Sequence, residues 1–322
     1  MSDNLISQKK ILLIGAGNMG IEYAKVLQAL GASFSTVGRG RESCDIFFQK
    51  TGLQAIDGGV ESHLRNATSY YDAAIVASDS KYLYDHTELC IRSGIRTFLV
   101  EKPGGLDTSD IRKLKSISDS NSSIFIAYNR RFYSSVLTAK RIIEEDGGIR
   151  SCSFDFTEWP HTVEKLDLPD LEKRNWVLRN SSHVLDLVFH LCGNPVELNS
   201  ESFSGNISWT PKSIFVGFGI TDKKIPFSYH ANWESPGRWW IEFNTNFRKL
   251  IFKPLEQLQM QEHGSIKVEP VSLEDAYDRN YKPGLFLQVR NWIEDKTESL
   301  CGIDEHFGRV GSVYSKIAGF EF

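Results

Sequence analysis

A glycine-rich turn near the start of the chain constrains its fold more than any other feature. Gly15-Ala16-Gly17-Asn18-Met19-Gly20 directly follows a short apolar run with strand character, and residues 21–30 after it have helical spacing. In such a unit, Gly15 permits the tight turn, Gly17 lets the backbone approach a pyrophosphate, and Gly20 lets the helix pack on the strand. The free N–H groups of the helix then face the phosphates. The motif therefore predicts a dinucleotide site, and a plain glycine turn is the alternative.

The segment after the next strand-like run bears on the choice of dinucleotide. NAD-binding proteins usually place an acid at this strand end for the ribose hydroxyls, whereas this chain has Gly38-Arg39-Gly40-Arg41-Glu42-Ser43. A guanidinium pairs well with a 2′-phosphate, which an acid would repel. Arg39, Arg41 and Ser43 therefore favour NADP(H) over NAD(H). A solvated basic loop is the alternative explanation for the two arginines.

Strand-like and helix-like segments alternate through the first half of the chain. The later strand-like runs are 32–37, 73–77, 95–100 and 124–127, with helical spacing at 82–93 and 108–118. This alternation predicts a doubly wound parallel sheet of the Rossmann type. Ligands of such sheets bind beyond the carboxyl ends of the strands, so Gly15 and Ser78 are expected on one rim. Lys102 and Asn129 follow later strands and belong to the same rim.

One of these strand ends carries an unusual charged pair. The run Thr97–Val100 leads to Glu101 and Lys102 and stops at Pro103-Gly104-Gly105. A lysine that ends a buried strand normally needs a partner or a task. Taken locally, a salt-bridged strand end explains the pair. The rest of the chain favours a chemical task for Lys102 instead.

Several motifs together resemble the glucose-fructose oxidoreductase/inositol dehydrogenase family over essentially the whole chain. They are the glycine motif, His86, Glu101-Lys102-Pro103 and Tyr128-Asn129-Arg130-Arg131-Phe132. The resemblance implies a Rossmann domain over residues 1–127 and a substrate-binding and oligomerisation domain over 128–322. It also implies a large, mostly antiparallel sheet in the second α/β domain, with C-terminal helices that pack back on the first domain.

The resemblance further implies NAD(P)-dependent oxidation or reduction, usually of a sugar, a polyol or a nucleotide sugar. Lys102 would lie beside the nicotinamide and the reacting carbon, and the peptide bond before Pro103 would be cis. The residues that the motifs and the resemblance together assign to the cofactor are Gly15, Gly17, Asn18, Met19, Gly20, Arg39, Arg41, Ser43, Ser78, His86, Glu101 and Lys102.

From Ser151 onward the pattern changes to one of alternating aromatic and β-branched residues. These runs, at 213–221, 225–233, 238–246 and 248–253, are separated by turn residues. They predict a half-buried antiparallel sheet whose aromatic side chains form a core or a subunit interface. Because sheets of the family pair face to face, the resemblance implies a homodimer or homotetramer.

A predicted helix in the second half supplies a second candidate for proton transfer. A serine at 181 or 182 is expected to cap this helix, which leaves His183 in its first turn. There the helix dipole disfavours the imidazolium, and a neutral imidazole can accept a proton. A metal site formed by His183, Asp186 and His190 is the weaker alternative, because the family works without metal; we expect none.

The family usually has an aspartate four residues before this histidine, and here that residue is Arg179. Its role is therefore lost or is taken by Asn180, a water or another residue. Arginines at 130, 131, 174 and 179 would bring positive charge to one cleft and favour a substrate with a carboxylate or phosphate. Pairing of each arginine with an acid is the alternative. The substrate-binding candidates are Asn129, Arg130, Arg131, Trp176, Arg179, Asn180 and His183.

The leading hypothesis is an NADP(H)-preferring oxidoreductase for an anionic sugar or nucleotide sugar. His183 would exchange the hydroxyl proton and Lys102 would stabilise the alkoxide. One alternative is a reductase of a non-sugar carbonyl or imine. Another is a cofactor-bound sensor that has lost catalysis, which the missing aspartate motivates.

Charge and composition argue against several other classes. The net charge is −4 with no block of like charges, which disfavours nucleic acid and anionic membranes as partners. No apolar run approaches the ~20 residues that span a bilayer. Five scattered cysteines without a CxxC pair argue against a zinc site or a disulfide framework. With a polar stretch at residues 1–10 that lacks a signal core, they favour a cytoplasmic protein.

Overall fold

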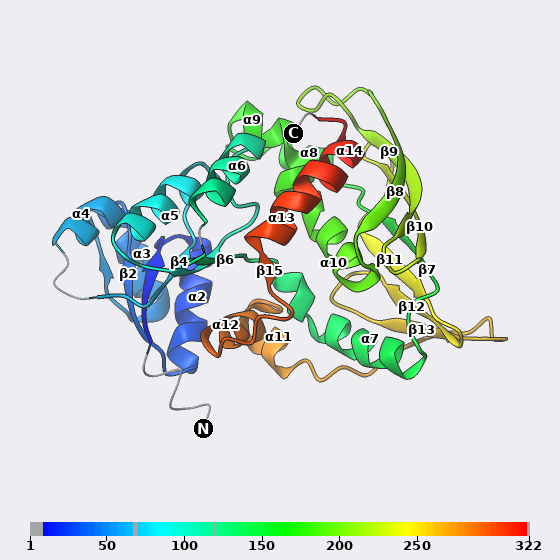
Figure 1. Ribbon diagram of the computed structural model, residues 1–322, viewed down its shortest axis with the longest axis horizontal. Coiled ribbons are helices and arrows are strands. Elements are labelled where there is room, and N and C mark those ends of the chain that lie inside the picture. Colours follow the sequence, from blue (N-terminus) through cyan, green and yellow to red (C-terminus); the bar gives the residue numbers. More distant parts are fainter. Residues whose placement is uncertain (1–8, 67–69, 119, 321–322) are drawn as a thin grey trace. The chain divides into compact units, whose positions relative to one another are not determined.

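The computed structural model describes residues 9–66, 70–118 and 120–320, so most of the stretch considered for a signal core lies outside the described residues. The chain forms two compact units (Figure 1). The first unit contains the residues up to Asn129 and the returning segment Tyr277–Phe307. The second unit contains Arg130–Ala276 and the residues from Gly308 onward.

Within the described residues, the first unit is built on a seven-stranded sheet of order β15-β6-β5-β4-β1-β2-β3. Its strands are β1 (Lys10–Ile14), β2 (Ser33–Val37), β3 (Ala55–Ile56), β4 (Ala73–Val76), β5 (Thr97–Val100), β6 (Ser123–Ile126) and β15 (Cys301–Gly302). All neighbours pair in parallel except β15, which runs antiparallel to β6. The central strands β1 and β4 are almost wholly buried, as expected for apolar runs covered on both faces.

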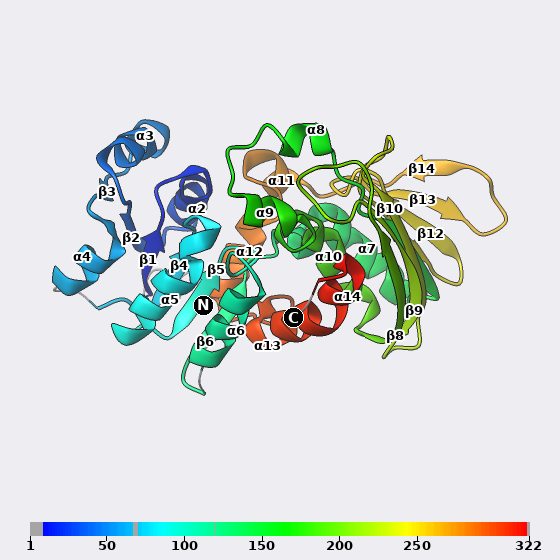
Figure 2. The ribbon, with the colours of Figure 1, turned by 90° about the horizontal axis from the view of Figure 1, so that it is seen from above.

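Helices cover both faces of this sheet (Figure 2). On one side α2 packs against α3 and α12, and on the other α5 packs against α4 and α6. Their bounds are α2 (Asn18–Ala29), α3 (Arg41–Thr51), α4 (Gly59–Asn66), α5 (Leu83–Arg92), α6 (Thr108–Ile117) and α12 (Leu285–Ile293). Two further helices, α11 (Ala276–Asn280) and α13 (Ile303–Arg309), flank the ends of the returning segment.

The second unit contains an eight-stranded sheet of order β14-β13-β12-β11-β7-β10-β9-β8. Its strands are β7 (Ser151–Asp155), β8 (Pro195–Phe203), β9 (Ile214–Thr221), β10 (Pro226–Asn232), β11 (Trp240–Asn244), β12 (Arg248–Phe252), β13 (Gln259–Glu262) and β14 (Val268–Pro270). Only the β7–β10 pair is parallel. Exposed and buried residues alternate along β10, which is the pattern of a sheet with one covered face.

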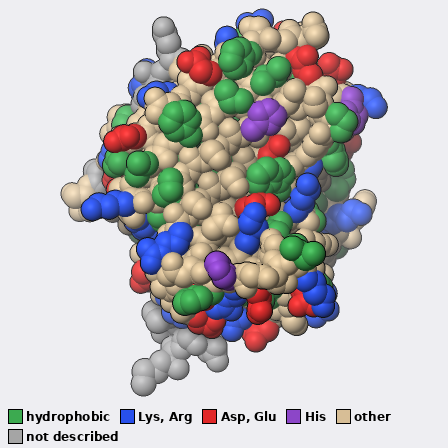
Figure 3. Space-filling model, turned by 90° about the vertical axis from the view of Figure 1, so that its right-hand side faces the viewer, with side chains coloured by type: hydrophobic (Ala, Val, Ile, Leu, Met, Phe, Trp, Pro, Cys, Tyr) green, Lys and Arg blue, Asp and Glu red, His purple; other side chains and the backbone are tan. Residues whose placement is uncertain are grey.

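Helix α10 (Ser182–Cys192) covers the inner face of this sheet, where Phe189 meets Phe154 and Phe227 with ring centroids 6.0 and 5.3 Å apart. The unit also contains the α-helices α7 (Ser134–Glu145), α8 (Pro160–Val163), α9 (Asp170–Arg174) and α14 (Ser315–Ala318), and a π-helical segment, Val310–Tyr314, leads into α14. The opposite face carries exposed hydrophobic side chains (Figure 3). Phe218 pairs with the exposed Ser228 of β10 and is itself 61% exposed.

These two sheets confirm the expected fold class, a doubly wound parallel sheet followed by a large, mostly antiparallel one. None of the helices in the described part of the chain is both long and apolar enough to cross a membrane.

Candidate active site

The turn between β1 and α2 is shaped for the close approach of a ligand. Gly15 has a φ of +113°, and a Cβ at Gly20 would collide with the Gly15 carbonyl, so both positions require glycine. At Gly17, by contrast, a Cβ would meet nothing within 4 Å. The first turn of α2, with Asn18 and Met19, has no side-chain cap. Its N–H groups are therefore available to an anion such as a pyrophosphate.

A cavity of about 460 Å³ opens beside this turn. Six of the residues expected at the cofactor line it: Gly15, Gly17, Arg39, Ser43, Ser78 and His86. Arg41 is not among the lining residues; it begins α3 and its side chain is exposed. Glu42 does line the cavity and places a carboxylate where the sequence argument counted none. The electrostatic case for a 2′-phosphate therefore depends on Arg39, with Glu42 acting against it.

A chain of side-chain contacts forms one wall of the cavity. Arg39 Nη1 donates to the Tyr82 hydroxyl at 3.0 Å, and the Tyr82 ring stacks on His86 with centroids 5.6 Å apart. His86 Nδ1 lies 3.0 Å from Ser78 Oγ, and burial lowers the pKa of His86, which favours its neutral form. Tyr82 is a lining residue that the sequence did not predict. It follows the end of β4, at the same rim of the sheet as Ser78.

Glu101 and Lys102 follow β5, whose register with β4 and β1 aligns their carboxyl ends at one edge. Glu101 is 9% exposed, and Tyr23 on α2 donates its hydroxyl proton to Oε1 at 2.7 Å. Burial raises the pKa of Glu101, although the Lys102 ammonium and the Tyr23 hydrogen bond oppose the shift. The Lys102–Pro103 bond is cis, as the resemblance implied, and His306 Nε2 donates to the Pro103 carbonyl at 2.8 Å. The Glu-Lys-Pro turn is thus fixed from both sides.

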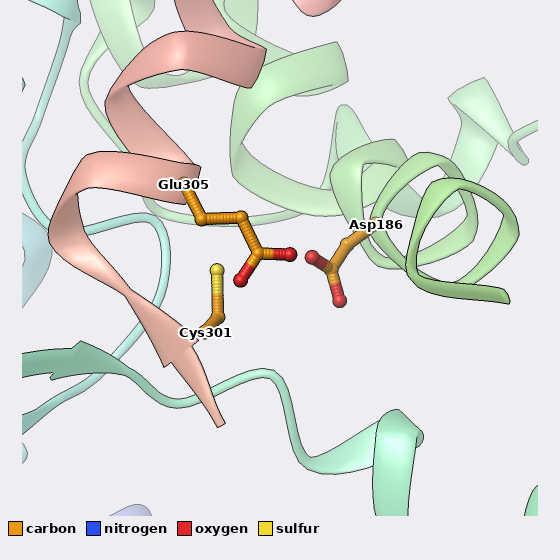
Figure 4. Close-up of side chains that lie close together, drawn as sticks. All are labelled: Asp186, Cys301 and Glu305. Atoms are coloured by element: carbon orange, nitrogen blue, oxygen red, sulfur yellow. The ribbon is translucent and has the colours of Figure 1, made fainter. Parts of the chain in front are cut away.

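The returning segment supplies further polar groups to the first unit. Asn129 donates from Nδ2 to the carbonyl of Pro283 at 2.8 Å, which ties the end of the sheet to that segment. Cys301 of β15 and Glu305 of α13 bring a thiol and a carboxylate oxygen within 4.8 Å of each other (Figure 4). The sequence predicts a substrate-binding role for Asn129 but no role for Cys301 or Glu305.

His183 lies in a continuous helical segment of the second unit. A π-helical turn, Val177–Ser181, runs directly into α10. Ser181 is itself helical and donates its hydroxyl to Glu158 Oε1 at 2.8 Å, so the expected capping by serine is wrong. Because the helix does not begin at this point, its dipole gives no support for a neutral imidazole. His183 is buried, with its ring centroid 6.2 Å from that of Trp239. Single π-helical turns of this kind are frequent at functional sites.

Asp186, three residues further along α10 (Figure 4), is committed to arginines. Arg131 donates to both carboxylate oxygens at 2.8 and 2.6 Å, and Arg309 donates to Oδ1 at 3.0 Å. Burial by itself would raise the pKa of Asp186, but the two guanidinium groups lower it overall. The ligand atoms of His183, Asp186 and His190 do not all converge within 4.8 Å. This network therefore does not favour the alternative of a metal bound by these three residues.

The other substrate candidates have different surroundings. Arg179, at the position of the family aspartate, forms an ion pair with Glu172 and lies over the buried Trp176 ring at 6.0 Å. Arg174 is exposed on α9. Asn180 donates from Nδ2 to Glu158 at 3.0 Å. Arg179 is thus neutralised, and Asn180 is held by an acid from another part of the chain.

Glu158 is the acid of this site that sequence reasoning missed. It follows β7, is 2% exposed, and accepts hydrogen bonds from Asn180, Ser181 and Arg238, the last from Nη1 at 2.8 Å. Burial raises the pKa of Glu158, while Arg238 and the other two donors oppose the shift. Since its oxygens accept four donated hydrogen bonds, the carboxylate is suited to hold other groups in place. The sequence indicates only strand alternation in this stretch, and the charge beside an aromatic residue in Glu158-Trp159 is the one signal there of a site.

The chain has the fold of several dehydrogenases of known structure. An oxidoreductase from Agrobacterium radiobacter in complex with NAD+, L-tartaric acid and magnesium gives a TM-score of 0.75 at 12% identity, over 97% of this chain and 96% of that chain. UDP-N-acetylglucosamine 3-dehydrogenase GnnA from Acidithiobacillus ferrooxidans gives 0.72 at 14% identity, over 97% of each chain. Levoglucosan dehydrogenase in complex with NADH and levoglucosan gives 0.75 at 14% identity, over 97% and 96%.

No protein-family model and no curated protein sequence matches the chain. At these identities the structural likeness establishes the fold, and the chemistry has to be argued from the residues of the two units.

Proposed function

We propose that this chain is an NAD(P)-dependent oxidoreductase that acts on a CH–OH group of a sugar or nucleotide sugar, within the glucose-fructose oxidoreductase/inositol dehydrogenase family. The observation that carries the proposal is the uncapped amino terminus of α2 behind Gly17, beside a cavity of about 460 Å³. This cradle suits a pyrophosphate. Lys102 lies at the same edge of the sheet, just after the end of β5, the strand next to β4. The names of GnnA and levoglucosan dehydrogenase indicate the substrate class.

The bound nicotinamide supplies the chemistry of a two-electron hydride acceptor or donor. When the alcohol is oxidised, the carbinol carbon loses a hydride and the hydroxyl loses a proton, which His183 accepts. The ammonium group of Lys102 stabilises the alkoxide that develops on the oxygen. Reduction of the carbonyl follows the same path in reverse. Glu101, held by Tyr23, fixes the direction of the strand end that presents Lys102.

We further propose a preference for NADP(H). The preference is supported by Arg39, which lines the cavity and donates to Tyr82, because a guanidinium pairs well with a 2′-phosphate. Glu42, also a lining residue, acts against this preference. Fluorescence titration with NADPH and with NADH measures the affinity for each cofactor, and tighter binding of NADH would overturn the proposed preference.

The proposal also includes a cytoplasmic homo-oligomer that pairs through the open face of the large sheet. Phe218 and Ile220 are large exposed hydrophobic residues that lie two residues apart on β9 and so on the same face of the sheet. Large exposed apolar patches mark interfaces. Light scattering of the protein and of its Phe218→Glu variant tests the association, which the variant should weaken.

Replacement of Lys102 tests the catalytic role. We expect Lys102→Ala to abolish turnover and to leave NADPH binding largely intact, because the cradle for the phosphates is formed by other residues. Lys25→Ala is the matched control, since Lys25 is a surface lysine of the same unit that pairs with Glu22. Normal turnover by Lys102→Ala would refute the assignment. Cofactor binding by the unaltered protein, without turnover on any member of a sugar and nucleotide-sugar panel, would favour the sensor instead.

A further inference from the structure

Two arginines and a tryptophan of the second unit form a cluster of cations on an aromatic ring. The guanidinium of Arg238 lies 4.3 Å from the centroid of the Trp239 ring, and that of Arg130 lies 5.0 Å from the same centroid. Glu158 anchors Arg238 through the hydrogen bond at 2.8 Å. We call Arg130, Glu158, Arg238 and Trp239 the arginine–tryptophan cluster. Its position, at the end of β7 and beside His183, makes it a candidate for ligand recognition.

Two donors of the cluster have no acceptor among the described residues. Arg130 Nε and Trp239 Nε1 are both shielded from solvent and without a hydrogen-bond partner. The contacts that the Arg130 guanidinium does make are with the faces of Trp239 and Tyr133, the latter at 5.8 Å. Arginine and tryptophan side chains can only donate, and buried donors without acceptors are rare in folded proteins. The cluster therefore lacks an acceptor group.

The charges of the cluster lead to the same conclusion. Two guanidinium groups face one buried carboxylate, and that carboxylate is bonded to Arg238. Arg130 has no ion-pair partner among the described residues, and Glu256, the other acid that acts on its charge, is exposed. A partly buried cation without a counter-charge is unfavourable, and an anionic ligand would remove that penalty.

We propose that the arginine–tryptophan cluster binds a single anionic group of the substrate, a carboxylate or a phosphate, with Arg130 as its principal ligand. The assignment of this anion to the substrate rests on the proposed function. Glu158 neutralises Arg238 and fixes it against Trp239, so Arg130 supplies the unopposed charge. Of the four arginines that the sequence suggested for this task, Arg131 and Arg179 already form ion pairs, with Asp186 and Glu172 respectively.

The neighbourhood of the cluster narrows the class of substrate. The Trp239 ring lies 6.2 Å from the ring of His183, the proposed acceptor of the hydroxyl proton. The Arg130 guanidinium lies 5.0 Å from the centroid of that same ring, so a sugar with a charged substituent could reach both residues. This arrangement fits a sugar acid or a sugar monophosphate, in which the charge is on or next to the ring.

Three probes that share one ring test the proposal: glucuronate, glucose 6-phosphate and glucose. Their binding to the full chain with NADPH bound is followed by tryptophan fluorescence, which requires no turnover. We expect at least one anionic probe to bind about tenfold or more tightly than glucose, because a charge-assisted hydrogen bond to a buried arginine is strong. The stronger of the two anions identifies the group as carboxylate or phosphate.

Substitutions assign the effect to the cluster. Arg130→Gln should remove the preference for the anionic probe, and Arg130→Lys, which keeps the charge, should restore part of it. Arg174→Gln is the matched control, because Arg174 is an exposed arginine of the same unit and should be dispensable. Thermal unfolding of each variant verifies that the fold is retained.

Equal binding of all three probes by the unaltered protein would overturn the proposal, as would an anion preference that survives in Arg130→Gln. Both outcomes are independent of hydride transfer. A protein that shows the preference but turns over no substrate would retain the anion site and lose only the proposed function.

Discussion

The glycine turn of the first unit and the histidine region of the second unit reach their functional geometry in different ways. The turn is formed by consecutive residues, and its shape follows from backbone constraints at Gly15 and Gly20. The histidine region instead depends on side chains from distant segments, such as Glu158 bonded to Arg238 and Arg131 bonded to Asp186. The comparison shows that a geometry made of backbone can be recognised locally in the sequence, whereas an arrangement of ion pairs cannot.

The largest loss of stability is expected when the ion-pair network around Asp186 is broken. Asp186→Asn removes the carboxylate that two buried arginines share, and breaking a buried pair costs about 3–5 kcal/mol of unfolding free energy. Urea unfolding at neutral pH measures the loss. A stability change below about 1 kcal/mol would show that the second unit does not depend on this network.

The pH dependence of the same variant provides a second measurement. The arginines lower the pKa of Asp186, so its stabilisation is fully present above the unfolded pKa of about 3.9 and is lost as the pH falls through the lower folded value. The difference in stability between the two proteins should therefore be constant near neutrality. Below about pH 4 it should shrink. A difference that grows on acidification would contradict the assigned ion pair.

The next prediction is that the same substitution changes stability at one glycine of the turn and cofactor binding at another. Gly20→Ala forces a Cβ against the backbone of Gly15 and should destabilise the protein by about 1–3 kcal/mol. Gly17→Ala finds open space and should leave unfolding unchanged while it weakens NADPH binding, because the methyl group occupies the approach to the phosphates. Thermal unfolding and cofactor titration measure both. Equal behaviour of the two variants would mean that the backbone geometry does not determine the cradle.

The last prediction concerns Glu158, where the main change is expected in function and not in stability. Glu158→Gln keeps the shape but removes the charge that holds Arg238, so kcat/KM should fall about tenfold or more, mainly through KM, with the fold retained. Glu172→Gln is the matched control, since Glu172 is also a buried carboxylate paired with an arginine of this unit. If both variants lose activity equally, the effect of Glu158 is structural and not specific to the site.

Much of the first unit was predictable because its signals are local. Parallel strands buried on both faces appear as apolar runs, and the glycines that close a strand–turn–helix unit are consecutive in the sequence. The position of Lys102 at one edge of the sheet was also predictable, because neighbouring parallel strands have their carboxyl ends on the same side. The cavity lining was less predictable, because the sequence does not show which side chains of a segment face the cavity, as Glu42 and Tyr82 do and Arg41 does not.

The second unit was predictable as a sheet but not as a site. Alternating residues such as Phe227, Tyr229 and Ala231 indicated one buried face. The expected cap at Ser181 was wrong because the helical segment already begins before Ser181, with a π-helical turn. No residue type in that segment predicts such a turn. Arg131 and Arg179 looked available for a ligand, since the sequence does not show that Asp186 and Glu172 lie next to them.

The sequence by itself determined the doubly wound sheet, the glycine turn at Gly15–Gly20 and the position of Lys102 after a strand end. These features depend on the steric limits of neighbouring backbone atoms and on the period of apolar residues, both of which are local. Only the tertiary structure decided which charges are neutralised. It paired Arg131 and Arg179, placed Glu158 against Arg238 and left Arg130 with aromatic faces instead of an acid. Electrostatic partners are selected by distance in space, and residues 80 positions apart become neighbours only when the chain has folded.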